Sequence, residues 1–171
     1  MGDASLHRGT STQLWYELVR EGEARMQVRL PDAVESYLVF VLQRHQADAL
    51  LGGRTMALEC LQGLERRGRD RLDGLRDVGD RCLLIAGLFP RLARRRNVAP
   101  EYYAALGQAA YGEVAAVARA GHAALFEQLA RGFDSMRRVL VGIVAPARMA
   151  ALDSGSAVDA HWHAFAARHL D

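Results

Sequence analysis

Apolar positions recur at helical spacing along most of the chain, and no segment alternates between apolar and polar residues over the length of a strand. The most regular stripe consists of Leu125, Leu129, Phe133, Met136, Leu140 and Ile143. It predicts one helix over about 122–144, and Pro146 marks or follows the end of that helix because proline has no amide hydrogen to donate. The pattern therefore predicts helices and offers nothing in favour of a sheet.

Turn residues and helix caps divide the remaining pattern into further helices. Ser11 or Thr12 can cap the first helix, and Pro31 and Pro100 suit the first turns of two others. Together with 122–144, the expected helices cover about 11–27, 32–46, 54–66, 69–89, 100–119 and 157–169, and Gly79 allows a break in the fourth. We therefore expect an all-α, single-domain bundle of six or seven helices over residues 11–171, after a flexible tail over residues 1–10.

One of these helices is apolar on almost every side. Between residues 32 and 46, its apolar positions are Val34, Tyr37, Leu38, Val39, Phe40, Val41 and Leu42. A helix with apolar residues all round is usually buried on several sides. We therefore expect this segment to be the buried central helix of the bundle.

The composition changes this picture little. All 22 basic residues of the 171-residue chain are arginine, which is typical either of bidentate contacts to phosphate and carboxylate or of a GC-rich genome. The scatter of the arginines among acidic residues favours the second explanation. The absence of lysine argues against Schiff-base chemistry and against a P-loop. The net charge is only +2, but residues 61–100 hold ten arginines and five acidic residues.

Signatures of catalysis and of metal binding are missing from the sequence. There is no Glu-x-x-His pair for a di-iron bundle and no Gly-x-Ser-x-Gly motif, and His161 and His163 would point away from each other on a helix. Cys60 and Cys82 lie in apolar surroundings, which is typical of reduced, buried thiols in a cytosolic protein. We expect no metal, no cofactor, no signal peptide, no transmembrane segment and a cytoplasmic location, and we consider an enzyme the less favoured class.

A basic connector after the fourth helix is the first candidate for a binding surface. Its arginines are Arg91, Arg94, Arg95 and Arg96. They can contact an acidic partner or nucleic acid, but basic residues after a helix also commonly stabilise its negative end. The low net charge argues against nucleic acid as the partner.

Tyrosines near an acidic residue form the second candidate. Glu35 and Tyr37 belong to the expected central helix, and Tyr103 and Tyr111 belong to the helix that Pro100 opens. A buried Glu35 needs a donor such as a tyrosine hydroxyl or an arginine. These four side chains either line a small-molecule pocket between the two helices or form a hydrogen bond that fixes their packing. Gly107 allows another helix to approach closely, with Gly87 as a candidate for the facing residue.

Three segments carry a resemblance. They are Val-Glu-Ser-Tyr-Leu-Val-Phe at 34–40, Gly-Asp-Arg-Cys-Leu-Leu-Ile-Ala-Gly-Leu-Phe-Pro at 79–90, and Tyr-Ala-Ala-Leu-Gly-Gln-Ala-Ala-Tyr at 103–111. Over about residues 12–118 the chain resembles an uncharacterised family of bacterial all-helical proteins. The resemblance implies a bacterial origin and a single domain, and it brings no activity, cofactor, partner or functional residue.

The functional hypotheses follow from ample apolar helical surface without an assembled catalytic set. The first is a non-enzymatic interaction or regulatory protein that acts through self-association or a protein partner. The alternative is a small-molecule-binding protein or enzyme with a pocket near Glu35 and Tyr111. The third is association with nucleic acid through the arginines at 91–96.

Overall fold

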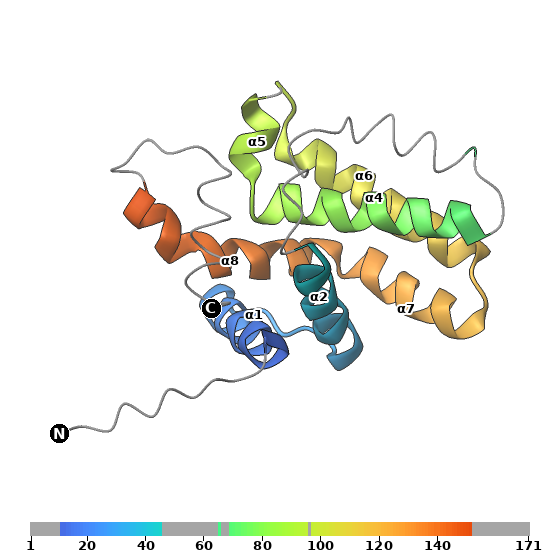
Figure 1. Ribbon diagram of the computed structural model, residues 1–171, viewed down its shortest axis with the longest axis horizontal. Coiled ribbons are helices and arrows are strands. Elements are labelled where there is room, and N and C mark those ends of the chain that lie inside the picture. Colours follow the sequence, from blue (N-terminus) through green and yellow to red (C-terminus); the bar gives the residue numbers. More distant parts are fainter. Residues whose placement is uncertain (1–10, 46–64, 66–68, 96, 152–171) are drawn as a thin grey trace.

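The protein is a bundle of helices with two layers packed on either side of one long helix (Figure 1). A computed structural model describes residues 11–45, 65, 69–95 and 97–151. The described helices are α1 (Ser11–Met26), α2 (Asp32–His45), α4 (Arg69–Gly87), α5 (Pro90–Arg95), α6 (Pro100–Val117), α7 (Ala120–Arg131) and α8 (Phe133–Ala151). These ranges contain no strand, and the all-α bundle predicted from the sequence is confirmed.

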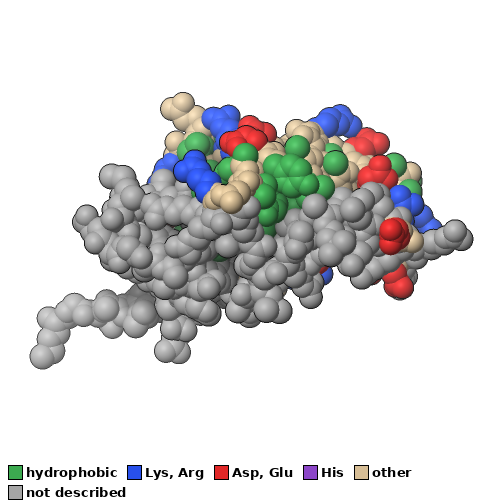
Figure 2. Space-filling view, turned by 90° about the horizontal axis from the view of Figure 1, so that it is seen from above, with side chains coloured by type: hydrophobic (Ala, Val, Ile, Leu, Met, Phe, Trp, Pro, Cys, Tyr) green, Lys and Arg blue, Asp and Glu red, His purple; other side chains and the backbone are tan. Residues whose placement is uncertain are grey.

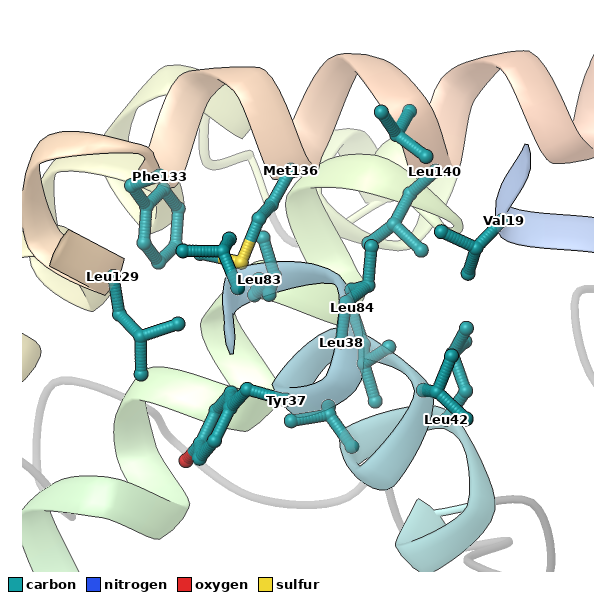
Figure 3. Packing of buried hydrophobic residues seen from close by; sticks show 14 of the residues in the cluster. Val19, Tyr37, Leu38, Leu42, Leu83, Leu84, Leu129, Phe133, Met136 and Leu140 are labelled. Atoms are coloured by element: carbon teal, nitrogen blue, oxygen red, sulfur yellow. The ribbon is translucent and has the colours of Figure 1, made fainter. Parts of the chain in front are cut away.

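The packing partners of each helix define the two layers. α4 packs against α5, α6 and α8, and α6 also packs against α7. α1 packs against α2 and α8, so that the first and last described helices lie together. In Figure 1, α8 crosses the molecule between the α4–α6 pair and the α1–α2 pair. Figure 3 shows Leu38 of α2, Leu84 of α4 and Met136 of α8 converging in the core between these layers.

Local chemistry explains the turn between α1 and α2. Gln27 has a φ of 53°, which takes the chain out of the helix. The buried carboxylate of Glu23 accepts a hydrogen bond from the Leu30 amide at 2.7 Å, and the Pro31 carbonyl accepts from Val34 and Glu35. The turn is therefore held by the side chain of Glu23 in α1 and by the backbone carbonyl of Pro31 immediately before α2.

The most completely enclosed helix is α4. It is buried without interruption from Val78 to Gly87 and stays helical through Gly79. Eight of the 14 residues of α2, the helix that we expected at the centre, are buried, whereas Phe40 is exposed. A buried central helix is therefore present, and α4 rather than α2 fills that place most fully. The reason is that α4 has helices on several sides, while the outer side of α2 faces solvent.

Two boundaries predicted from the sequence are wrong. The single helix expected over 122–144 is two helices, α7 and α8, which meet at Gly132. Gly132 has a ψ of 7°, yet its amide still donates to Gln128 and its carbonyl still accepts from Met136. The helical spacing of the apolar residues continues across this joint. The spacing alone therefore could not reveal that one helix ends and another begins here. In addition, α8 continues past Pro146 to Ala151.

Other predicted features fare differently. The basic connector is partly a short helix, α5, followed by a turn at Asn97 with a φ of 55°. Gly87 does not face Gly107; it lies against Leu140, while Gly107 lies against Phe133 and Cys82.

Some predictions concern residues outside the described ranges. These are the tail over 1–10, the helix over 157–169, nearly all of the helix over 54–66, and the residues Cys60, His161 and His163. No described helix has both the length and the apolar character needed to cross a bilayer.

Candidate functional site

A buried carboxylate links three helices at the centre of the molecule. Asp80 of α4 has no exposed surface, and its Oδ1 accepts hydrogen bonds from the hydroxyls of Tyr37 of α2 and Tyr111 of α6, each at 2.8 Å. Gly79 makes room for this arrangement, because a Cβ at that position would collide with the ring of Tyr111. Asp80 therefore supplies the hydrogen-bond acceptor, and its neighbour Gly79 leaves room for the ring of Tyr111, one of the two donors.

The second oxygen of Asp80 faces basic groups. Nη1 of Arg44 lies 3.4 Å from Oδ2, and Nε2 of His45 lies 3.9 Å from the same atom. Arg44 also reaches Asp77, which accepts a 2.8 Å hydrogen bond from Arg81 one turn further along α4. A carboxylate removed from water needs hydrogen bonds and opposite charge, which the tyrosine hydroxyls supply at Oδ1 and the basic groups supply at Oδ2.

Burial controls the chemistry of the two tyrosines. Desolvation, followed by the nearby charge of Asp80, raises the pKa of Tyr37 far above its ordinary value of 10.0. The same two causes raise the pKa of Tyr111 well above that value. Both hydroxyls therefore stay protonated and act as donors to Asp80. This protonation state suits a structural hydrogen-bond network better than proton transfer near neutral pH.

Aromatic contacts extend the network toward the surface. Phe126 of α7 packs edge-on against both Tyr37 and Tyr111, with ring centroids 5.6 Å apart in each case. The guanidinium of Arg76 lies over the rings of Tyr37 and Phe40, at 5.9 and 4.9 Å from their centroids. The tyrosine pair is thus connected through Phe126 and Arg76 to the outer surface of α4 and α7.

The four residues proposed for a pocket are only partly brought together. Tyr37 and Tyr111 meet in a T-shaped contact with ring centroids 6.0 Å apart. The carboxylate of Glu35 is buried and accepts a 3.1 Å hydrogen bond from Arg20 of α1 instead. Tyr103 belongs to a separate apolar cluster with Cys82. The donor that a buried Glu35 was expected to need is therefore an arginine, Arg20. The acid beside Tyr37 and Tyr111 is Asp80.

Sequence reasoning missed Asp80, although a signal was present. The stretch from Val78 to Phe89 is apolar except for Asp80 and Arg81. A lone acid and its basic neighbour within such a stretch point to a paired, buried charge, because an unpaired one is too costly to bury.

The arginine candidates are less fully described. Of Arg91, Arg94, Arg95 and Arg96, the structure describes the side chain of Arg94, which is exposed on α5. The backbone of Arg91 and Arg95 belongs to α5, and Arg96 lies outside the described residues. Their role as an anion or partner contact stays a prediction.

The outer face of α6 is the second notable feature of the surface. The middle of this face carries no charge and consists of Tyr102, Ala105, Ala109 and Ala116, which are exposed, and Gly112, which is half-buried; they are separated alternately by three and four residues. We call these five residues the α6 line. Tyr102 is 48% exposed, and a Cβ on Gly112 would meet no atom within 4 Å. Figure 2, seen from the side of α5 and α6, shows hydrophobic side chains gathered in the middle of the described surface, with charged side chains around them.

Other kinds of site find no support in the described part of the chain. No group of three or more His, Cys, Asp or Glu side chains there could hold a metal ion. Cys82 is fully buried. No protein-family model, curated protein or solved structure matches the chain. The resemblance to a bacterial helical family therefore stays a prediction.

Proposed function

We propose that the protein is a non-enzymatic helical interaction protein that acts by pairing with a second copy of itself through the α6 line. The observation that carries this proposal is that the middle of the outer face of α6 is uncharged, with Glu101, Gln108 and Glu113 exposed at its edges. The inner face of α6 packs into the core through Tyr103, Tyr111 and Val114, whereas its outer face exposes the α6 line.

The alternating spacing of the α6 line favours a helix as the partner. Apolar residues at intervals of three and four form the seam along which two helices pack, and small residues allow their backbones to approach closely. In an antiparallel pair around Ala109, Tyr102 of each copy would cover Ala116 of the other. A two-fold interface of this kind uses the same surface twice, so one large and one small residue at its ends complement each other.

The charges at the two ends of α6 favour the same arrangement. Glu101 lies at the beginning of the helix and Arg119 lies just beyond its end, and both are exposed. Antiparallel pairing would bring Glu101 of one copy toward Arg119 of the other. The opposed helix dipoles add to this attraction. We further propose a cytoplasmic location, because two cysteines in a chain of this length do not form a disulfide framework.

Sedimentation equilibrium tests the proposal. An 18-residue helix is about 27 Å long, and one helix pair buries less than the roughly 800 Å² per partner of a standard interface. We therefore expect weak pairing, with the mean mass rising from one chain toward two between about 1 and 500 µM. Ala109→Glu places a charge in the middle of the seam and should keep the protein monomeric over this range.

Ala124→Glu is the matched control, because Ala124 is an exposed alanine within α7 and lies away from the α6 line. It should pair as the unsubstituted protein does. Circular dichroism establishes that both variants keep the helical fold. A monomer at every concentration, or equal pairing by the two glutamate variants, would show that the α6 line is not the contact.

A further inference from the structure

A groove between α4, α6 and α7 lies beside the buried tyrosines, and it shares Arg119 with the proposed pairing but none of the α6 line. Its volume is about 720 Å³, within the roughly 300–1,000 Å³ of pockets that bind small molecules. Leu72 and Arg76 line it from α4, Val114 and Val117 from α6, and His122 and Phe126 from α7. Three helices therefore contribute to its walls.

The floor of the groove is apolar and firmly held. Phe126 is 2% exposed, and its ring contacts both Tyr37 and Tyr111, whose hydroxyls are fixed on Asp80. Val114 is also buried, and Leu72 is half-buried. A floor held by a hydrogen-bonded network loses little conformational entropy when a ligand binds on it. Such a floor suits a flat, apolar ring.

The rim of the groove is mainly basic. Arg76, Arg119 and His122 stand against one acidic side chain, Asp73. Nε of Arg76 is buried and has no hydrogen-bond partner among the described residues, while the guanidinium is held over the rings of Phe40 and Tyr37. A guanidinium held in place in this way favours a carboxylate or phosphate oxygen. Asp73 offsets part of this charge and disfavours a polyanion such as nucleic acid.

The backbone at the start of α7 adds to the positive field. Arg119, the residue before this helix, makes no side-chain hydrogen bond to its first amides. A Cβ on Gly121 would meet no atom within 4 Å, so the space there is open. The free amides of a helix start are favourable to an anion, and here they stand beside Arg119 and His122.

We propose that this groove binds a small organic anion with one charged end and one apolar ring. The ring lies on Leu72, Val114 and Phe126, and the carboxylate or phosphate head is held by Arg76, Arg119 and His122. The floor supplies affinity by excluding water from the ring. The rim selects the charge and its orientation.

Isothermal titration calorimetry with three probes of one shape tests this proposal. The probes are 2-naphthoate, 2-naphthyl phosphate and the uncharged 2-naphthamide, each titrated to about 2 mM, a range suited to weak binding. We expect at least one anion to bind about tenfold more tightly than the amide, because charged hydrogen bonds contribute more than neutral ones. The stronger anion identifies the head group.

Arg119→Gln removes one charge from the rim and should weaken binding of that anion about five- to tenfold. Arg131→Gln is the matched control, because Arg131 is an exposed arginine at the other end of α7, paired with Glu127. It should leave binding unchanged. Both positions are exposed, so both variants should fold. Equal binding of anions and amide, no binding of any probe, or equal losses in the two variants would overturn the proposal.

Discussion

At the scale of single residues, Asp80 decides how three helices meet. Its Oδ1 accepts hydrogen bonds from two hydroxyls, one of Tyr37 in α2 and one of Tyr111 in α6. Its Oδ2 faces Arg44 and His45. Apolar side chains can pack in several registers, whereas a buried carboxylate is satisfied in few of them. The network therefore selects one register for α2, α4 and α6 and positions Phe126 at the floor of the groove.

The same network makes stability depend on alkaline pH. In the unfolded chain tyrosines lose their protons near pH 10, whereas burial and Asp80 raise the pKa of Tyr37 and Tyr111 in the folded protein. The unfolded state then binds fewer protons, so this contribution is complete below pH 10 and is lost as the pH rises further. We expect the free energy of unfolding to fall by about 1.4 kcal/mol per pH unit for each of the two tyrosines.

Urea unfolding of Tyr111→Phe between about pH 9 and 11 checks this slope, whose decrease should grow above pH 10 toward the equivalent of one proton. Val114→Ala, one turn further along α6, destabilises the same region and removes no titrating group, so it should keep the original slope. An unchanged slope in Tyr111→Phe would mean that Tyr111 releases its proton in the folded state.

The comparison of Glu35 with Asp80 shows how far the sequence could define the site. Tyr37 and Tyr111 could be selected because tyrosines in apolar helices need a hydrogen-bond partner. The identity of the acid depended on how α2 turns relative to α1 and α4, which no spacing within one helix specifies. Glu35 faces Arg20 of α1, and Asp80 of α4 faces the tyrosines.

At the scale of helices, glycines set the closest approach. Gly22 of α1 and Gly142 of α8 lie against each other where these helices cross. A Cβ on Gly22 would collide with the carbonyl oxygen of Val139 and the side chain of Ile143. The contact between α1 and α8 therefore depends on the absence of side chains at this crossing.

We expect Gly22→Ala to lower the free energy of unfolding by about 2–3 kcal/mol, because the new methyl group overpacks the crossing. Gly112→Ala is the matched control within α6. Its methyl group would meet open space, so the better helix propensity of alanine should stabilise the monomer by about 0.5–1 kcal/mol. Urea unfolding at low protein concentration measures both changes, and a neutral Gly22→Ala would show that α1 can move away from α8 at little cost.

Prolines predicted the beginnings of helices correctly, whereas the end predicted at Pro146 and the break allowed at Gly79 are absent. Pro31 and Pro100 correctly marked the beginnings of α2 and α6, because proline suits the first turn. The sequence allowed a break at Gly79, where α4 is continuous, and predicted none at Gly132, where α7 ends. Tertiary contacts decide between them: Tyr111 packs on Gly79 within a continuous α4, whereas Phe133 enters the core immediately after Gly132.

At the scale of the whole molecule, α4 joins two apolar clusters. One cluster contains Trp15 of α1 together with Leu83 and Leu84 of α4. The other contains Cys82 and Ile85 of the same helix. The α4 residues of the two clusters follow one another along a single helix. Unfolding α4 in one cluster therefore also disturbs the packing of the other cluster.

We therefore expect both clusters to unfold in one transition. In a Cys60→Ser, Trp162→Phe background, Trp15 fluorescence reports the first cluster and the reaction of Cys82 with a thiol reagent reports the second, since both residues are fully buried. The two urea transitions should coincide, with free energies of unfolding that agree to about 1 kcal/mol. If Cys82 became reactive at a much lower urea concentration, α5 and α6 could open while α1, α2 and α8 stay packed. Coincident urea transitions would instead show that the α6 line and the groove unfold together with the rest of the bundle, coupled to it through α4.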